Sequence, residues 1–206
     1  MRVTNLAKLA VTAGLACAMS ACVAGPRVSP VEITRFHQSG AVSQLGSGTI
    51  FVENAPGDEV DAAELSVFKA AIASELAELG YREVPRSEAS QIAQVRVQRY
   101  VSQPERSRSP VSVGAGGSTG TYGSGLGLGI GINLGGGQRE MIGTDLGVMI
   151  RDKASNDVIW EGRASISVSD NSDYADSSAN ASVIADALFS EFPGNNGETV
   201  EVRVSN

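Results

Sequence analysis

The feature that most constrains the fold is a long alternation of apolar and polar residues between positions 144 and 168. Apolar or small residues occupy every second position of residues 144–150, and the pattern returns in residues 158–168 after the polar segment 153–157. Successive side chains of a strand point to opposite faces, so the pattern predicts a long hairpin with one buried and one wet face. The predicted buried face comprises Thr144, Leu146, Val148, Ile150, Val158, Trp160, Gly162, Ala164, Ile166 and Val168, and the wet face of the second strand comprises Ile159, Glu161, Arg163, Ser165 and Ser167.

Two other segments have the periodicity of amphipathic helices. The first runs from Asp61 to Leu79; its opening aspartate and Glu64 have capping-box spacing, and Gly80 favours a stop. The second runs from Ser177 to Glu191 and is followed by Pro193. The apolar stripes are Leu65, Phe68, Ile72, Leu76 and Leu79 in the first helix, and Val183, Ile184, Ala187 and Leu188 in the second.

Shorter alternating segments predict the remaining strands. One strand begins at Val31, a second covers Gly48–Glu53, and a third covers Gln94–Gln98, where Val101 extends the apolar face. The tail Thr199–Val204 is predicted to form an edge strand. Each predicted helix has one apolar stripe, which must pack on a sheet. The sequence therefore predicts an α+β fold: an antiparallel sheet with two helices packed on one face.

The first 22 residues have the layout of a bacterial lipoprotein export signal. Arg2 and Lys8 give a basic start, and Leu6–Met19 is an apolar run of about 14 residues, below the roughly 18 needed for a membrane-spanning helix. Small residues lead directly into Cys22, as in a lipobox. We therefore expect residues 1–21 to be a cleaved signal peptide. The alternative is an ordinary secretory signal in which this cysteine lies near the cleavage site by chance.

Lipidation of Cys22 fixes the expected location of the protein. Its thiol would carry diacylglycerol and its new amino group a further acyl chain, and two or three acyl chains anchor a protein stably. Val23 follows, where an aspartate commonly signals retention in the inner membrane, so we expect the periplasmic face of the outer membrane. Residues 22–30 would form the lipidated tether and residues 31–206 a single domain, without a disulfide because Cys17 is removed with the signal.

The charge of the mature chain argues against one class of partner. Loss of residues 1–21 leaves 14 basic and 23 acidic side chains, a net charge of −9. Because such a surface repels phosphate backbones, we expect no nucleic-acid binding.

A glycine-rich segment, residues 114–137, holds half of the chain's 24 glycines. It contains no dinucleotide-binding or phosphate-loop spacing, so a nucleotide site is rejected. A strand here would have a bare face that another layer can approach closely, whereas a helix would present a ridge of small residues; we favour a strand or loop. The bare positions, our candidate docking surface, are Gly123, Gly125, Gly127, Gly129 and Gly131, alternating with Leu126, Leu128, Ile130 and Ile132.

The residues that could carry chemistry form no recognisable site. His37 is the only histidine, which excludes metal clusters built on several histidines, and we interpret it as a solvated or partly packed strand residue. Asp170, Asp173 and Asp176 lack the ligand spacing of a calcium loop and read as a polar connection into a helix. We therefore predict no catalytic residue, no metal and no cofactor.

The order of these elements resembles a known family. A helix ending in Leu79-Gly80-Tyr81 is followed by a strand, a glycine-rich segment, a hairpin carrying Val158–Gly162 and a helix running into Glu191-Phe192-Pro193. This order, together with the lipobox, is similar to the bacterial periplasmic lipoproteins grouped as domain of unknown function forty-one thirty-six. The resemblance spans about Val31 to Pro193 and implies a compartment and a fold but no active site; the acidic tail beyond it is a departure.

Two functions follow as hypotheses. The first is a non-catalytic envelope lipoprotein whose sheet and glycine-rich segment dock another envelope protein. The second is a membrane-active assembly subunit that inserts residues 123–134, whose length matches the roughly 9 to 11 residues of a spanning strand. An enzyme is the least favoured class.

Overall fold

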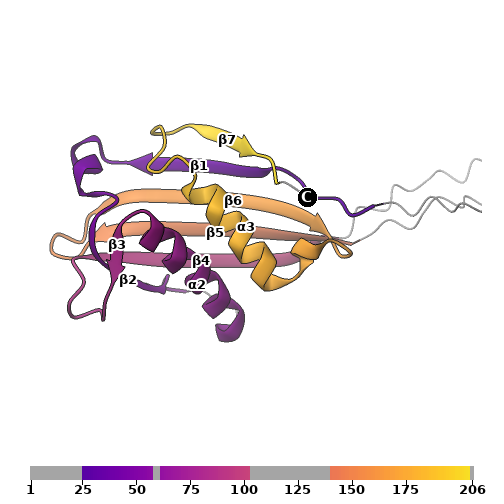
Figure 1. The fold of residues 1–206 in the computed structure, drawn as a ribbon, viewed down its shortest axis with the longest axis horizontal. Helices are drawn as coiled ribbons and strands as arrows, with labels where there is room; N and C mark the ends of the chain where they lie inside the picture. The colour runs from indigo at the N-terminus through magenta and orange to yellow at the C-terminus, as the bar shows by residue number, and fades with distance from the viewer. Residues whose placement is uncertain (1–24, 58–60, 103–139, 205–206) are drawn as a thin grey trace, which may run out of the picture.

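A computed structural model describes residues 25–57, 61–102 and 140–204. In this part of the chain, seven strands form one sheet in the order β3-β2-β4-β5-β6-β1-β7, and two α-helices cover one of its faces (Figure 1). The elements in chain order are β1 (Val31–His37), the 3₁₀ helix η2 (Ser39–Gln44), β2 (Gly48–Asn54), α2 (Ala62–Glu78), β3 (Tyr81–Glu83), β4 (Gln91–Ser102), β5 (Met141–Asp152), β6 (Val158–Ser169), the 3₁₀ helix η3 (Asp173–Ala175), α3 (Ser177–Phe189) and β7 (Thr199–Val202).

The sheet is mixed, so the prediction of a purely antiparallel sheet was wrong. Strand β2 runs parallel to both of its neighbours, β3 and β4, whereas the pairs from β4 to β7 are antiparallel. The reason is that α2, between β2 and β3, carries the chain back along the sheet, as a crossover helix does between parallel strands. The α+β class and the placement of both helices on one face agree with the prediction.

The long hairpin has the predicted register. Leu146 pairs with Ala164 and Val148 with Gly162, and the predicted inward positions from Thr144 to Ile150 are buried. Two positions of β6 differ from the prediction: Ile159 was placed on the wet face but is buried, and Val158 was placed on the buried face but is only half-buried. The strand pairing shifts register there, and the Ile159 carbonyl accepts a hydrogen bond from the Gln38 backbone beside η2.

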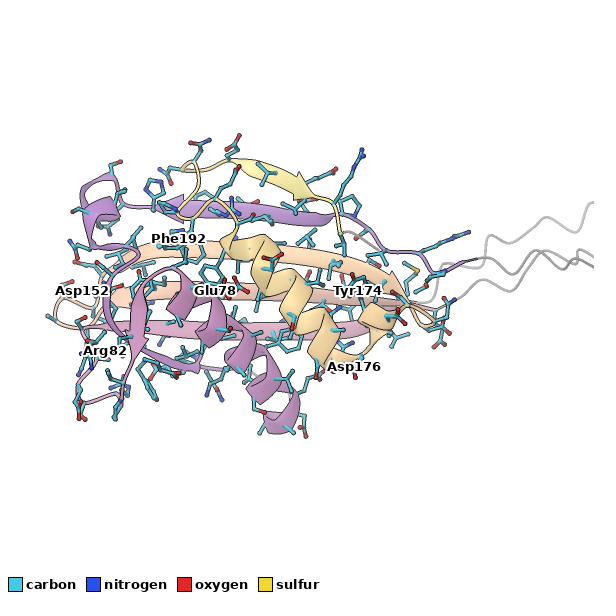
Figure 2. All side chains as sticks on the ribbon, viewed as in Figure 1. Glu78, Arg82, Asp152, Tyr174, Asp176 and Phe192 are labelled. Carbon is cyan, nitrogen blue, oxygen red and sulfur yellow. The ribbon has the colours of Figure 1, made fainter. Side chains whose placement is uncertain are left out.

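Both helices begin at side-chain caps. The carboxylate of Asp61 accepts hydrogen bonds from the backbone amides of Ala63 and Glu64, at 2.8 and 3.4 Å. Asp176 caps α3 in the same way, which explains the acidic residue before that helix (Figure 2). Gly80 follows α2 with a φ of +105°, a left-handed conformation that favours glycine.

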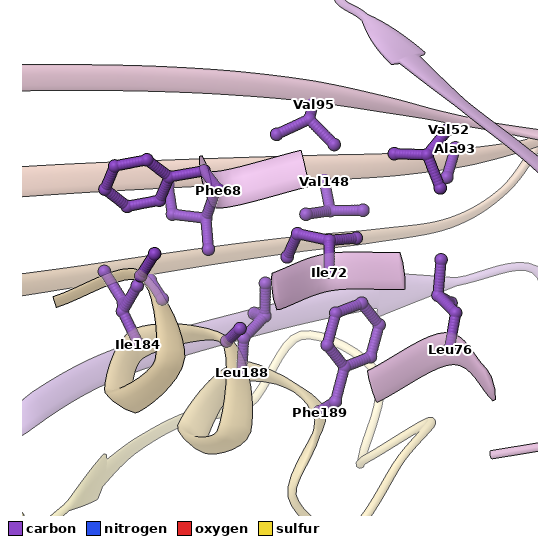
Figure 3. Packing of buried hydrophobic residues seen from close by; sticks show 14 of the residues in the cluster. Val52, Phe68, Ile72, Leu76, Ala93, Val95, Val148, Ile184, Leu188 and Phe189 are labelled. Atoms are coloured by element: carbon purple, nitrogen blue, oxygen red, sulfur yellow. The ribbon is translucent and has the colours of Figure 1, made fainter. Parts of the chain in front are cut away.

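The core lies between the helices and the sheet. Phe68, Ile72 and Leu76 of α2 and the apolar side chains of α3 pack together against Val95 and Val148 of the sheet (Figure 3). The predicted stripe of α2 is therefore buried, apart from its half-buried last member.

Trp160 lies in an aromatic cluster at the end of α3 and is fully buried, as its inward position predicted. Its ring stacks on Phe189 at a centroid distance of 5.4 Å and contacts Phe192 at 5.1 Å. The indole Nε1 donates to the carbonyl of Pro193 at 3.1 Å, so the polar atom of the ring has a partner.

Arg35 is a buried cation at the same helix end. Its guanidinium donates to the main-chain carbonyls of Ala187, Leu188 and Ser190, at 3.2, 3.0 and 2.6 Å. The carbonyl of Leu188 is one that a helix end leaves without an intrahelical partner, whereas that of Ala187 also accepts from the Ser190 amide at 3.3 Å. A cation at this end also complements the helix dipole. Burial lowers the pKa of Arg35, and the nearby carboxylate of Glu191 opposes that shift.

Four segments meet at one end of the sheet. In the strand register Ser102 pairs with Met141, which pairs with Ser169. The backbone of Arg27, just before β1, exchanges hydrogen bonds of 2.8 Å with Ser169. The N-terminal segment and both flanks of residues 103–139 therefore leave the domain at one end, where the C-terminal segment also ends (Figure 1).

The tail forms the predicted edge strand, β7, beside β1. Val101, in contrast, is 59% exposed although it was predicted to extend the apolar face of β4. It lies one residue from the end of the strand.

Candidate functional site

The face of the sheet opposite the helices carries a groove of about 690 Å³. It crosses β4, β5 and β6 and reaches β1, and its side chains are the outward positions of the alternating strands. The residues after β2 form one wall. We call this surface the open face; the groove residues used below are Glu32, Thr34, Gln94, Arg96, Asp145, Gly147, Met149, Arg151, Glu161 and Arg163.

Gly147 forms the middle of the groove floor. It pairs with Arg96 on β4 and with Arg163 on β6, so an arginine lies on each side of a residue without a side chain. A Cβ added at Gly147 would meet only the Cβ of Arg96, at an ordinary 3.9 Å. The floor therefore has free space above it.

The two arginines are held from different directions. Arg96 donates to the carbonyl of Pro56 at 3.0 Å, and Arg163 forms an ion pair of 2.6 Å with Glu161 on its own strand. Both arginines are exposed residues. Arg163 can rearrange toward a partner at low cost, because exposed ion pairs stabilise a fold by only about 0–1 kcal/mol.

A hydrogen-bonded chain of polar side chains runs along one side of the groove. Arg151 Nε donates to Gln94 Oε1, and Gln94 Nε2 donates to Glu53 Oε1, each at 3.1 Å. Glu53 also pairs with Arg86 at 2.7 Å. Partial burial by itself would raise the pKa of Glu53, but the hydrogen bonds from Arg86 and Gln94 outweigh it and lower that pKa. The chain fixes side chains of β2, β4 and β5 relative to one another.

Asp145 gives the groove a half-buried carboxylate. It lies on β5 between Gln98 and Ser165, and partial burial raises its pKa. Its ionised form is thus less well solvated than a surface carboxylate, and a cationic or hydrogen-bond-donating group of a partner would stabilise it.

The residues considered for chemistry do not come together. His37 is half-buried at the end of β1, and its Nδ1 is buried without a hydrogen-bond partner in the described part of the chain. Asp170, Asp173 and Asp176 lie in the connection to α3, as predicted. Within residues 25–57, 61–102 and 140–204, no group of three or more His, Cys, Asp or Glu side chains is placed to hold a metal ion.

The other predicted site residues lie outside the described residues. These are the lipidation site, Cys22, and the proposed docking positions Gly123, Gly125, Gly127, Gly129 and Gly131. No helix in the described ranges is both long and apolar enough to cross a membrane.

The groove itself was not predicted from the sequence. The alternation placed Arg163 and Glu161 on the wet face, and the same pattern puts Gly147 on that face of β5. A glycine among larger polar residues was the available signal, because a bare position in a strand permits close approach of another molecule.

Comparison with known proteins assigns the chain to a family. A family model described as Domain of unknown function (DUF4136) matches residues 34–194. The chain belongs to this family. The resemblance drawn from the order of its elements is thereby confirmed, and every groove residue of the DUF4136 domain except Glu32 lies within the match.

Solved structures similar to the DUF4136 chain have low sequence identity to it. A PDZ domain protein from Parabacteroides distasonis is 18% identical, with a TM-score of 0.50 over 85% of this chain, and this chain covers 38% of that protein. Two PelC dodecamer structures from Paraburkholderia phytofirmans are each 12% identical over 81% of this chain, with TM-scores of 0.42 and 0.40, and are covered over 94% and 96% of their own chains. No curated protein matches the chain.

Proposed function

We propose that this DUF4136 protein is a non-catalytic lipoprotein of the outer membrane that faces the periplasm and docks another envelope protein on its open face. The observation that carries the proposal is the groove: four strands build a hollow with a glycine floor on the face opposite α2 and α3. A sheet face of this kind accepts a protein segment without rearrangement of the core.

The charges of the groove favour a protein partner. Arginines 96, 151 and 163 lie among the carboxylates of Glu32, Asp145 and Glu161. Both signs are interspersed over a short distance, which suits the mixed side chains of a protein surface and not a uniform polyanion. The net charge of the mature chain supports the same choice.

The membrane anchor is supported by where the N-terminal segment leaves the domain. The backbone of Arg27 is fixed to the end of β6, and four residues lie between it and Cys22. The five residue-to-residue steps from Cys22 to Arg27 span at most about 18 Å, so lipid on Cys22 would hold this end of the sheet close to the membrane. The groove would then lie about 20 Å farther along the strands, six residues from Ser169.

Site-directed crosslinking in cells tests the docking role. A photoreactive residue in place of Arg163 should form a specific adduct with one envelope protein, whereas the same residue in place of Asp186, on the exposed side of α3, should not. Gly147→Leu should abolish the adduct by filling the groove floor. Gly40→Leu is the matched control, because a Cβ at Gly40 meets nothing within 4 Å, much as one at Gly147 meets only a single atom at 3.9 Å, but Gly40 lies in η2. Equal adducts from both positions, or an adduct unaffected by Gly147→Leu, would contradict docking on the open face.

A second candidate function is membrane activity by insertion of residues 123–134, which lie within the segment 103–139. Both flanks of this segment leave the sheet at the end where the tether leaves, which favours a position near the bilayer. Dye release from liposomes by the intact protein tests it. Release that is lost when residues 123–134 are deleted supports insertion, and the absence of release at any protein density contradicts it.

A further inference from the structure

The end of the sheet nearest the tether carries the most exposed apolar side chains of the described residues. The exposed large hydrophobic residues in these ranges are Phe36, Val42, Tyr100 and Val101, at 42%, 39%, 51% and 59%. Tyr100 and Val101 are adjacent near the end of β4, whereas Val42 lies in η2 at the opposite end, beside the β5–β6 turn. Two neighbouring exposed apolar residues at a strand end call for a physical explanation.

The two side chains extend apolar surface on both faces of the sheet. Val101 pairs with Ile142, which pairs with the buried Val168, so one apolar row runs outward from the core. Tyr100 lies over Gly143 on the open face, where an added Cβ would collide with its ring. The ring therefore packs against the backbone of Gly143 while about half of the residue stays exposed.

The position of the tether indicates what covers this surface. The apolar row of Val101 and Ile142 lies directly beside the last paired row of the sheet. That last row runs from Ser102 through Met141 to Ser169, whose side chain and backbone bind Arg27. Strands β4 and β6 are separated by two strand spacings, about 10 Å. The five residue-to-residue steps from Arg27 to Cys22 reach at most about 18 Å, so an anchored lipid and the apolar row can meet the same surface.

We propose that Tyr100, Val101 and Ile142 form a second, protein-borne membrane contact, in which this end of the sheet rests on the phospholipid surface. The proposal depends on the lipid anchor of the proposed function. Once the anchor is inserted, it holds the apolar side chains next to the bilayer at a high effective concentration, so this second contact needs little affinity of its own. Tyrosine suits this position, because its ring is amphipathic and prefers the interface between lipid and water. The contact orients the domain with its strands rising from the bilayer, so that the open face points along the membrane and not toward it.

The contact is apolar and not electrostatic in character. Glu140 and Asp170 lie at the same end, and the amide of Asp170 donates to the carbonyl of Glu140 at 3.0 Å. Acidic residues near the bilayer do not favour anionic lipid. The contact should therefore need no anionic lipid and should form on vesicles of zwitterionic phosphatidylethanolamine and phosphatidylcholine.

Single-cysteine labelling of the full mature protein tests this inference. Val101→Cys and Val42→Cys form a matched pair, since both replace an exposed valine, and they lie at opposite ends of the sheet. If Cys22 is acylated and Cys17 is removed with the signal, the introduced thiol is the only one to label. Each variant carries an environment-sensitive fluorophore and is reconstituted through its own lipid into phosphatidylethanolamine–phosphatidylcholine vesicles containing brominated lipid.

The expected result is a blue-shifted emission and strong quenching by brominated lipid at position 101, with neither at position 42. Tyr100→Cys provides a second reading on the same end. Proteins that float with the vesicles but show water-like emission at 100 and 101 overturn the contact and leave the anchor intact. Blue-shifted emission without lipid quenching also overturns it, because another part of the protein then covers the patch. Labelling of the wild type, together with failure to float, contradicts the anchor itself and the contact with it.

Discussion

Arg35 connects the end of α3 to β1 through a charged side chain that is only 5% exposed. Its three main-chain acceptors belong to residues 187, 188 and 190, beside the aromatic cluster around Trp160. In the chain, Arg35 occupies the inward phase set by Val31 and Ile33. A charge in that phase indicates a specific buried partner, because an unpaired charge is too costly to bury.

Arg35→Met should lower the free energy of unfolding by about 3 kcal/mol, because it leaves buried carbonyls without their charged donor. Arg35→Lys should lose less, since it keeps the positive charge near the helix end but not the planar fork of donors. Urea unfolding of the two variants beside the wild type measures both values. A loss below about 0.5 kcal/mol for the methionine variant would show that water satisfies these carbonyls.

Two glycines on opposite faces of the hairpin give a matched test of packing. A Cβ at Gly162 would collide with the Trp160 ring and lie 2.8 Å from Leu188 Cδ1, whereas a Cβ at Gly147 meets nothing closer than 3.9 Å. Gly162→Ala should therefore cost about 1–3 kcal/mol by overpacking the core. Gly147→Ala should change stability by less than about 0.5 kcal/mol, or raise it slightly. Similar melting temperatures for the two variants would mean that the faces of the sheet are assigned wrongly.

At the scale of elements, α2 and α3 pack against each other with a charge conflict. Burial raises the pKa of Glu75 on α2, and the carboxylates of Asp186 on α3 and Glu78 raise it further. A raised carboxylate pKa means that the folded state binds a proton more tightly than the unfolded state does. Stability from this group is therefore present at low pH and is lost as the pH rises through the folded pKa.

Glu75→Gln should then stabilise the protein at neutral pH, because it removes a half-buried negative charge that lies near two other carboxylates. The advantage over the wild type should shrink as the pH falls through the raised pKa, where Glu75 itself becomes neutral. Denaturant unfolding of both proteins at a series of pH values measures this difference. A wild type that is more stable than the variant at neutral pH, or a difference independent of pH, contradicts the assignment.

Local patterns predicted the elements better than their arrangement. The alternation around Val148 and Gly162 gave the hairpin and its register, and Asp61 marked the start of α2, because those signals are carried by neighbouring residues. The direction of β2 was missed because it depends on pairing with β4 across the helix crossover. The groove was missed for a similar reason: its floor needs two arginines from strands far apart in the chain.

For the whole molecule, the proposed lipid anchor would explain why several features lie at one end of the sheet. The tether, both flanks of residues 103–139 and the exposed Tyr100 and Val101 share one end of the sheet. An anchor at Cys22 would present the groove to the periplasm at a fixed height. Without it, this end of the sheet is an ordinary strand terminus.

Intact-mass analysis of the mature protein purified from membranes tests the account most directly. The account predicts a chain that begins at Cys22 and carries the added mass of diacylglycerol and a further acyl chain, and it predicts that Cys22→Ser leaves an uncleaved or mislocalised precursor without lipid. A mature terminus at another residue, with an unmodified mass, would contradict it.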